Sequence, residues 1–391
     1  MRIKDVKVTL LSYQVPKEKQ HRTDLGWVVK HDTTIVEVVT DEGLCGYGTG
    51  VGEPEIIGVT VAQQLKPLLV GEDPTQIEWL WQKMYSGSRA HLSMERGTTL
   101  PILGRRGLTL CAIAAVDIAL WDLWGKVLKQ PVCRLLGQSR SSIRAYASGG
   151  WAPGDEAEQE MAEYVALGFK AVKMRVEGRD GFSIVKSLRR IRAARRGIGP
   201  DVELMVDAHG SLDVATATQL ACGMAEYGIT WFEEPVSPDD HDGLAEVRAA
   251  GGVPVAAGEN EFTRFDFLSL LTKRAVDVIQ PDLGIAGGFT EVRRIAALAS
   301  SFGVRLAPHN WGSGLLFAAS LHMTLSAPNC HFLEVSQATN PLVHELFEEP
   351  FEMRDGQVYM PGRPGLGYTL RKDLEKRFPY APGPIHLKDR G

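Results

Sequence analysis

Acidic residues recur at a constant interval in the middle of the chain. Asp207, Glu233 and Glu259 are separated by 26 residues each, and each follows a short apolar run. Three carboxylates brought together repel one another unless a cation lies between them, and an all-oxygen ligand set favours Mg2+, with Mn2+ possible. The spacing therefore predicts a site for one hard divalent cation. For any single one of these acids, the alternative is a solvated strand end or a helix cap.

A histidine and an aspartate further along the chain could do acid-base chemistry. Asp282 ends the run "AVDVIQPD", and His309 stands in the run "VRLAPHN". An aspartate beside a histidine can accept a hydrogen bond from one imidazole nitrogen, which raises the basicity of the other. We therefore predict that His309 is a general base oriented by Asp282. The alternative is a rim histidine bonded to backbone.

Two cations stand two residues apart in "KAVKMRVEG". Side chains alternate along a strand, so Lys173 and Arg175 project to the same side. Beside a metal-bound carboxylate, Lys173 would supply positive charge to the enolate that forms when the neighbouring proton is removed. The alternative is a surface strand with a charged outer face.

The elements that must position these residues are eight apolar runs separated by helix-length amphipathic segments. This alternation is typical of a parallel α/β barrel, so we predict a (β/α)8-type barrel over residues 140–340. The ionisable residues stand at the carboxyl ends of the runs, which converge on one mouth of such a barrel. The runs are "IRAYASGG", "KAVKMRV", "VELMVDAHG", "ITWFEEP", "VPVAAGEN", "AVDVIQPD", "VRLAPHN" and "CHFLEVS".

The two ends of the chain do not show the alternation of strands and helices that is expected of the barrel. Residues 1–130 begin with strand-like alternation and a "DEG" hairpin turn and continue with helical patterning, which predicts an α+β domain. The apolar stretch "LTLCAIAAVDIALWDLWG" carries Asp117 and Asp122 and is short for a bilayer span, so we expect a buried helix. Residues 341–391 contain Pro and Gly turns and are expected to pack on the N-terminal domain.

Composition narrows the class of protein. The chain has 391 residues, 44% of them hydrophobic, and a net charge of -5, which argues against a dedicated nucleic-acid binder. The N-terminal "MRIKDVKVTLLSY" lacks the pattern of a signal peptide, and no membrane partner is expected. Five scattered cysteines without CxxC spacing indicate reduced thiols in a cytoplasmic protein.

The ordered set of motifs resembles the enolase superfamily, and more narrowly its mandelate racemase-like branch. The resemblance covers nearly the whole chain and includes "DEGLCGYGTG" and "AVDIALWDLWGK" in the N-terminal part. It implies that this part is a capping domain, that a His309/Asp282 pair acts as acid and base, and that Glu334 bonds the substrate carboxylate. It also implies Mg2+ held by Asp207, Glu233 and Glu259, and a homo-oligomer. The barrel motifs that carry it are "KMR", "VDAH", "WFEEP", "AGEN", "QPD", "PHNWGSG" and "FLEVS".

The chain departs from many members of that branch at two positions. Arg175 stands where many relatives carry a second lysine that serves as a base, and a guanidinium stays protonated at ordinary pH. Arg175 is therefore expected to stabilise charge or clamp a carboxylate. His209 stands where many relatives place Asn, which resembles mannonate dehydratase-like members in which the histidine protonates a leaving hydroxyl. The alternative for His209 is a neutral substrate contact.

Two loops of the capping domain, near residues 16–30 and 49–55, are expected from the resemblance to close over the substrate. The side chains of the first loop are polar enough to bind a hydroxylated acid, and the alternative is that this loop is only solvated. These residues are His21, Arg22, Thr23, Asp24 and Trp27. The glycine-rich "GIAGGFTE" at 284–291 could seat a phosphate, but we interpret it as a tight turn.

We therefore expect a lyase that acts on a small-molecule carboxylate. It would remove the α-proton of a sugar-derived hydroxycarboxylate and expel the β-hydroxyl, giving a 2-keto-3-deoxy acid. The alternatives are a racemase or epimerase, which needs a second competent base, a cycloisomerase, and a non-catalytic metal-binding barrel.

Overall fold

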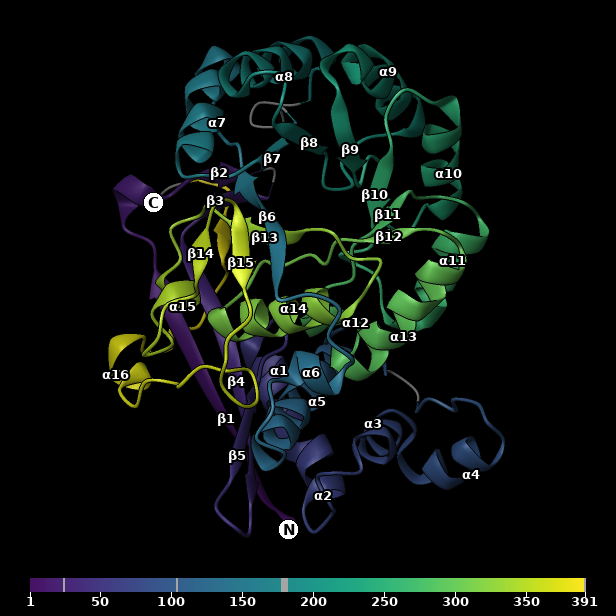
Figure 1. Cartoon of the computed structure of the whole chain (residues 1–391), viewed down its shortest axis with the longest axis vertical. Coiled ribbons are helices and arrows are strands. Elements are labelled where there is room, and N and C mark those ends of the chain that lie inside the picture. The colour runs from purple at the N-terminus through teal and green to yellow at the C-terminus, as the bar shows by residue number, and fades with distance from the viewer. Residues whose placement is uncertain (24, 103–104, 177–181, 390–391) are drawn as a thin grey trace.

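The computed structural model describes residues 1–23, 25–102, 105–176 and 182–389. A barrel forms one half of the molecule, and the N-terminal domain lies beneath it in the view of Figure 1. The tail runs along both halves, and its end lies beside the first strands of the chain.

Eight parallel strands form the barrel, and they match the eight apolar runs of the sequence. They pair in chain order from β6 to β12, and β13 pairs with β6. A bridge between Leu306 and Cys330 joins β12 to the segment before β13, which closes the ring. The predicted (β/α)8-type barrel is confirmed. The strands are β6 (Ser142–Gly149), β7 (Ala171–Arg175), β8 (Glu203–Asp207), β9 (Ile229–Glu233), β10 (Val255–Ala257), β11 (Val278–Ile279), β12 (Arg305–Leu306) and β13 (Leu333–Ser336).

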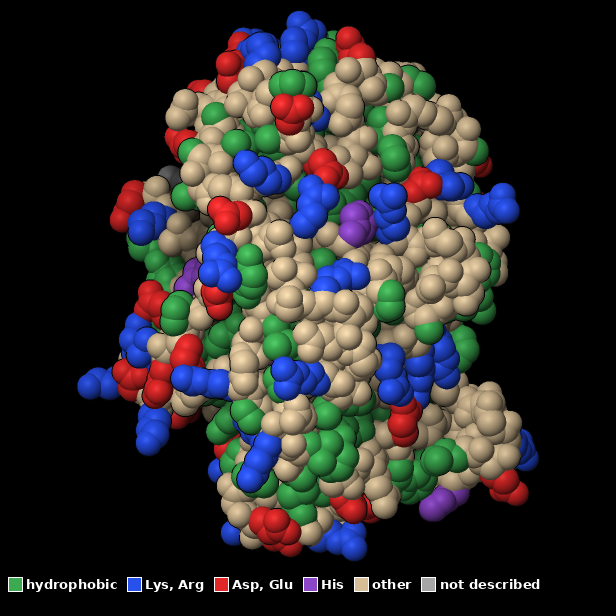
Figure 2. Space-filling model, viewed as in Figure 1, with side chains coloured by type: hydrophobic (Ala, Val, Ile, Leu, Met, Phe, Trp, Pro, Cys, Tyr) green, Lys and Arg blue, Asp and Glu red, His purple; other side chains and the backbone are tan. Residues whose placement is uncertain are grey.

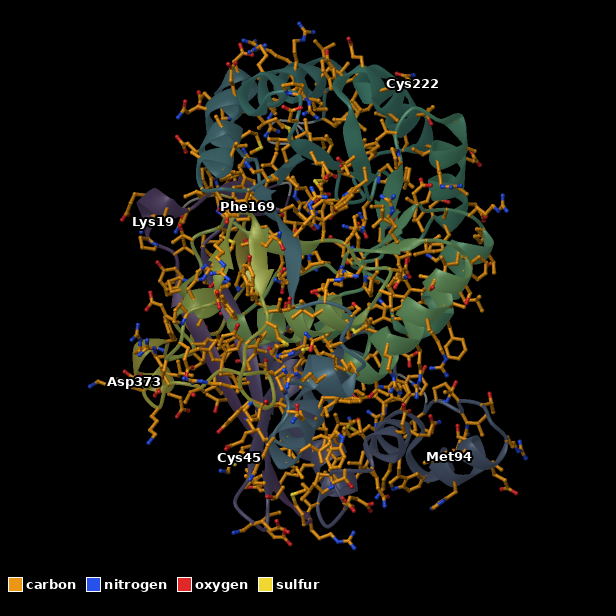
Figure 3. The ribbon with its side chains drawn as sticks, in the orientation of Figure 1. Lys19, Cys45, Met94, Phe169, Cys222 and Asp373 are labelled. Carbon is orange, nitrogen blue, oxygen red and sulfur yellow. The ribbon has the colours of Figure 1, made fainter. Side chains whose placement is uncertain are left out.

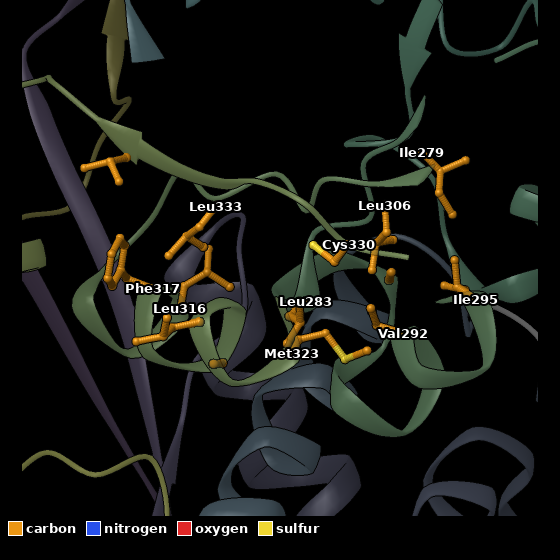
Figure 4. Close-up of a cluster of buried hydrophobic side chains, with 14 of the residues drawn as sticks. Ile279, Leu283, Val292, Ile295, Leu306, Leu316, Phe317, Met323, Cys330 and Leu333 are labelled. Atoms are coloured by element: carbon orange, nitrogen blue, oxygen red, sulfur yellow. The ribbon is translucent and has the colours of Figure 1, made fainter. Parts of the chain in front are cut away.

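Helices cover the outside of the barrel (Figure 1), and most of them have one buried and one exposed face, whereas α14 is buried throughout. In α8, buried Ile191 and Ala194 lie on the face toward the barrel, and the Ser183 hydroxyl caps the first turn by accepting a hydrogen bond from the Lys186 amide. Figure 4 shows Leu333 near Leu316 of α14 and Ile279 near Ile295 of α13, so strand side chains pack on the outer helices. The helices are α7 (Ala157–Ala166), α8 (Ile184–Ile198), α9 (Val214–Met224), α10 (His241–Ala250), α11 (Thr263–Thr272), α12 (Leu283–Ala286), α13 (Gly288–Ser301) and α14 (Gly314–Ser326).

A packed layer inside the barrel supports the mouth. Each strand, or the residue adjoining it, contributes one buried side chain, and three aromatic rings, Tyr146, Trp231 and Phe332, contact one another edge to face. Because side chains repeat every two residues along a strand, the position two residues later on most strands points into the same interior. The polar residues of the mouth therefore lie directly above this buried layer, which we call the floor. The floor consists of Tyr146, Ala171, Met205, Trp231, Ala256, Val278, Ala307 and Phe332.

The N-terminal domain packs an antiparallel sheet against one long helix. The sheet contains β1 (Ile3–Gln14), β4 (Lys30–Thr40) and β5 (Cys45–Gly48), and the predicted "DEG" turn connects the last two. Gly46 lets helix α5 (Leu108–Val127) approach closely, since a Cβ there would lie 2.0 Å from the Ala119 carbonyl oxygen. Helix α5 is long and apolar enough to cross a membrane, but 83% of its apolar window is buried inside the protein, as predicted.

Buried carboxylates of α5 join the N-terminal domain to the rest of the chain. Asp117 accepts hydrogen bonds from the amide and hydroxyl of Thr290 at 3.0 and 2.5 Å. A Cβ on Gly288 would lie 2.3 Å from the Asp117 carboxylate, so the glycine-rich segment approaches α5 closely. It joins α12 to α13 at Gly287, which has a positive φ of 115°. Asp122 accepts from the amides of Tyr47 and Leu366, both at 2.8 Å.

A lobe of short helices extends from this domain toward the barrel. Figure 3 labels Met94 on α4 in this lobe. The lobe contains α3 (Ile77–Ser86) and α4 (Ala90–Glu95). Helices α1 (Pro54–Thr60) and α2 (Lys66–Leu69) pack on β1, and α6 (Val132–Leu135) follows α5.

The tail contacts both halves of the molecule. As expected, it packs on the N-terminal domain: α15 (Pro341–His344) and α16 (Leu374–Arg377) contact β1, and β16 (His386–Leu387) pairs with β3 (Gly26–Val28). It also pairs β15 (Gln357–Tyr359) with β6, and β14 (Met353–Arg354) with β15, which extends the barrel sheet. The domain boundaries 1–130, 140–340 and 341–391 stand as our proposal.

All five cysteines are free thiols. Figure 3 shows two of them far apart, Cys45 in the sheet of the N-terminal domain and Cys222 on an outer helix of the barrel. Their separation agrees with the expectation of reduced cysteines.

Candidate active site

His309 and Asp282 form a buried pair at the mouth of the barrel. The Nδ1 atom of His309 lies 2.7 Å from Asp282 Oδ2, and Asp282 Oδ1 accepts a hydrogen bond from the Gly284 amide at 2.6 Å. Two partners thus hold the carboxylate in place. With Asp282 accepting from Nδ1, the neutral imidazole carries its lone pair on Nε2, and this atom is the one available to take a proton.

Glu259 lies between two imidazoles. Its Oε1 atom is 3.5 Å from His209 Nε2, and its Oε2 atom is 3.6 Å from His309 Nε2. His209 has a positive φ of 50°, a conformation that histidine adopts more often than most residues. Its amide donates to Asp207 Oδ1 at 2.8 Å. This turn brings the imidazole of His209 to the mouth.

Lys173 lies among three carboxylates. Its ammonium contacts Glu233 Oε1, Glu334 Oε1 at 2.9 Å and Asp207 Oδ2 at 3.5 Å. The side chain is 4% exposed. Burial alone would lower the pKa of Lys173, but these acids outweigh it and hold the pKa well above its usual range. Lys173 is therefore protonated in this arrangement.

Arg175 lies beside Asp207 at the edge of the mouth. Its Nε atom is 3.5 Å from Asp207 Oδ2, and the two residues are register partners on β7 and β8. Burial would raise the pKa of Asp207, but the charges of Arg175, Lys173 and His209 lower it. Asp207 is thus ionised and faces a guanidinium.

Glu334 is completely buried and ordered by donors. Its Oε2 atom accepts from the Asn310 amide at 2.8 Å, and its Oε1 atom accepts from Trp311 Nε1 at 3.2 Å. Burial would raise its pKa, but Lys173 and then His309 bring it down to about 2. Asn310 and Trp311 therefore support the site by holding Glu334.

The basicity of His309 depends on the acids around it. Burial would lower the pKa of this imidazole, but Glu259, Asp282 and Glu334 raise it to about 10. Glu259 is the largest of these raising contributions. A cation that neutralised Glu259 would therefore bring the pKa of His309 back toward neutrality, where it can serve as a base.

The predicted metal ligands lie on neighbouring strand ends. Within the described residues, no three His, Cys, Asp or Glu side chains are grouped so that they could hold a metal ion as they lie. Glu233 is instead bonded by Lys173, by Trp231 Nε1 at 2.9 Å and by Gln280 Nε2 at 2.7 Å.

The chemistry of these side chains still suits a hard cation. Asp207 Oδ2 is buried and, among the residues that the structure describes, has only the two cations Lys173 and Arg175 at 3.5 Å and no hydrogen-bond partner. Burial and the neighbouring carboxylates raise the pKa of Glu233 to about 7, despite Lys173. Crowded carboxylates with an unpartnered oxygen are a donor set that a divalent cation would stabilise, so the residues fit Mg2+.

Both loops of the capping domain reach the mouth. The ring of His21 packs on Trp151 with 4.3 Å between centroids, and the charge of Arg175 contributes to a lowered pKa of His21, after the larger effect of burial. Residues 49–53 line a cavity of about 230 Å³ together with residues 310–313. Arg22, Thr23 and Trp27 lie in or beside β2 (Arg22–Thr23) and β3, and Asp24 lies outside the described residues.

Sequence reasoning missed several residues of the site. Gln280 and Trp231 donate to Glu233, and Ser148 bonds Glu334. Glu234 accepts from Asn260 Nδ2 at 3.0 Å, and burial with the charges of Glu259 and Asp207 raises its pKa well above its usual range. For Gln280 and Ser148 a signal existed, because each stands two residues after a floor residue on its own strand.

Known proteins resemble the chain over nearly its whole length. The family described as mandelate racemase / muconate lactonizing enzyme, N-terminal domain, matches residues 5–137, and the family described as enolase C-terminal domain-like matches residues 156–374. Arabinonate dehydratase of Saccharolobus solfataricus is 34% identical, over 96% of this chain and 99% of its own. D-galactarolactone cycloisomerase of Agrobacterium fabrum is 37% identical, over 88% of this chain and 90% of its own.

A solved structure extends this likeness to three dimensions. A racemase from Streptomyces coelicolor A3(2) with bound magnesium is 30% identical, covers 96% of this chain and 99% of its own, and has a TM-score of 0.84. The fold, the order of the motifs and both family matches agree. The chain is an enzyme that belongs to the enolase superfamily, in its mandelate racemase-like branch.

Proposed function

We propose that the protein is a Mg2+-dependent dehydratase of a sugar-derived hydroxycarboxylate. The observation that carries the proposal is the placement of two imidazoles at one carboxylate, with His209 3.5 Å from one oxygen of Glu259 and His309 3.6 Å from the other. Elimination of water needs one group to take a proton and another to give one. The two histidines supply that pair at a single site.

His309 is the base in this proposal. Its Nε2 atom takes the proton from C2 of the substrate, and the electron pair of the broken C–H bond moves into the carboxylate to form an enediolate. Asp282 keeps the imidazole in the required tautomer and stabilises the imidazolium that results. Lys173 and Arg175 hold positive charge beside the enediolate.

His209 is the acid. As the C3–O bond breaks, its imidazolium gives a proton to the departing hydroxide, so that water leaves. The enol that remains tautomerises to a 2-keto-3-deoxy acid. Dehydratases of sugar acids among the relatives, such as the arabinonate dehydratase, support this reaction type.

Asp207, Glu233 and Glu259 are the residues that would hold Mg2+. When bound, the cation supplies positive charge to the substrate carboxylate as the α-proton leaves. The magnesium in the solved racemase supports this assignment. Glu334 would bond the same substrate carboxylate.

We further propose a small-molecule carboxylate as substrate, assembly as a homo-oligomer and a cytoplasmic location. The five free cysteines suit a reducing compartment. No part of the catalytic proposal depends on the number of subunits.

The second candidate is epimerisation or cycloisomerisation. The cycloisomerase and racemase among the similar proteins favour it. A racemase needs a proton acceptor on each face of C2, however, and the strand that would provide the second carries Arg175, which does not release its proton at ordinary pH.

Turnover in D2O distinguishes dehydration from epimerisation. Acid sugars and their C2 epimers would be incubated with the Mg2+-loaded enzyme, and proton NMR would follow exchange at C2 and formation of keto acid. We expect one C2 configuration to react and keto acid to accumulate without epimer. Exchange and interconversion of both epimers without loss of water would overturn the dehydratase.

The variant His209→Asn tests the acid separately. Removing the proton donor should suppress keto acid formation by about 10²-fold or more. Exchange of the C2 proton with solvent should persist, because His309 remains. Unchanged production of keto acid would remove His209 from the mechanism.

A further inference from the structure

An arginine-rich cavity lies where the lobe of α3 and α4 meets barrel helix α11. Its volume is about 550 Å³. Figure 2 shows Lys and Arg side chains gathered near the junction of this lobe with the barrel. None of the proposed active-site residues lines the cavity. Its polar lining consists of Arg89, Arg105, Arg106, Tyr85 and Thr99.

Arg105 is buried, and no ion pair to it is found within the described residues. The residue is 6% exposed, and its Nη1 atom donates to Gln64 Oε1 at 3.0 Å. Its Nε atom is buried and has no hydrogen-bond partner within the described part of the chain. A neutral amide leaves the positive charge uncompensated, and a buried cation without a counter-charge is costly.

The other cationic groups of the cavity leave a positive excess. Arg106 is neutralised, because its Nη1 atom lies 2.6 Å from Asp266 Oδ2. Arg89 is exposed at the rim. No acidic residue is among the described residues that line the cavity. Burial raises the pKa of Tyr85, so its hydroxyl stays protonated and can donate a hydrogen bond.

Two neighbouring arginines, unlike Arg105, form ion pairs with carboxylates. Arg264 and Arg294 contact the buried carboxylate of Glu291 at 2.8 and 2.6 Å. Arg294 also pairs with Glu78. Arg105 differs from these two because its side-chain acceptor is neutral.

We propose that this cavity binds an oxyanion, a phosphate or carboxylate group, against Arg105 with Arg89 at the rim. A guanidinium presents paired N–H donors that match two oxygens of such a group. The group comes either from a small phosphorylated or carboxylated metabolite or from an acidic side chain of a second copy of this chain. The site is separate from the barrel mouth and does not depend on the reaction catalysed there.

Calorimetric titration with inorganic phosphate at constant ionic strength tests the site. Wild-type protein should bind phosphate, and Arg105→Gln should weaken binding by about 10-fold or more, as expected for the loss of a charge-assisted contact. The matched control is Arg354→Gln, which removes an arginine that is 62% exposed on β14. This control should bind phosphate like the wild type.

Light scattering after size exclusion separates the two sources of the anion. If a second copy supplies the acid, wild-type protein forms an assembly that Arg105→Gln reduces in mass, and phosphate competes with it. If a metabolite supplies it, the mass is unchanged and only phosphate binding is lost. Equal phosphate affinity, or no phosphate binding at all, together with an unchanged mass in Arg105→Gln overturns the proposal.

The rim provides a second variant if Arg105→Gln fails to fold. Arg89 is exposed, so Arg89→Gln should leave the packing of the lobe intact. We expect it to weaken phosphate binding about threefold or to loosen the assembly, in keeping with a partly solvated contact. In that case, phosphate affinity and mass that both equal those of the wild type refute the site.

Discussion

The barrel mouth and the arginine cavity each bury a cation, but they surround it differently. Lys173 is 3% exposed and lies within 3.5 Å of three carboxylates, Asp207, Glu233 and Glu334. Arg105 is 6% exposed, and the side chain that it bonds is the neutral Gln64. The first environment has an excess of negative charge, and the second has an excess of positive charge.

The difference shows that burial alone does not say what a charged residue does. At the mouth, the acids outnumber Lys173, so the site can accept a further cation, and we propose Mg2+. In the cavity, no acidic side chain of the described residues pairs with the guanidinium, so the site can accept an anion. The balance of charge around each buried group indicates the kind of ligand.

The largest effect is expected from His309→Asn at the mouth. Removing the base should lower kcat by about 10³-fold or more, within the range for general acid-base catalysis. Mg2+ affinity, measured by calorimetry, should change little because His309 is not a proposed ligand. Activity equal to that of the wild type would remove the base from the mechanism.

Replacing the buried cation should lower the free energy of unfolding at the barrel mouth but not in the arginine cavity. Lys173→Met leaves three buried carboxylates without their ammonium, and breaking a buried pair in this way costs about 3–5 kcal/mol. We expect the free energy of unfolding, measured in urea without Mg2+, to fall by an amount near that range. Unchanged stability would show that the acids of the mouth do not need Lys173.

The pH dependence of Asp282→Asn sharpens the description of the mouth. Asp282 raises the pKa of His309, and His309 must be neutral to act as a base, so losing the carboxylate should move the acidic limb of the kcat/KM profile to lower pH. Turnover should fall by about 10- to 10²-fold through poorer orientation of the imidazole. An unchanged profile would show that Asp282 only fills space.

The smallest effect is expected from Arg105→Met in the cavity. Removing an uncompensated buried charge while keeping a long apolar side chain should leave stability unchanged or raise it by about 1 kcal/mol in phosphate-free buffer. Phosphate should stabilise the wild type but not this variant. A loss comparable to that of Lys173→Met would mean that Arg105 is compensated in the folded protein.

The sequence alone was sufficient to predict the barrel and to place the candidate site residues at its mouth. Eight apolar runs gave eight strands, because short β-rich runs between amphipathic helices have few other stable arrangements. The constant interval of Asp207, Glu233 and Glu259 placed all three at one mouth, since each interval is one strand-helix unit. The close contact of His309 with Asp282 followed from adjacent strands in the same way.

Tertiary structure decided which partners these side chains take. No local pattern indicates that Gln280 bonds Glu233, or that β15 of the tail pairs with β6, because these contacts join segments far apart in the chain. Likewise, the sequence presents Arg105 as one of many arginines, and only the fold shows that its acceptor is Gln64. Alternation and spacing determine the direction of a side chain, whereas charge compensation depends on neighbours that only packing brings together.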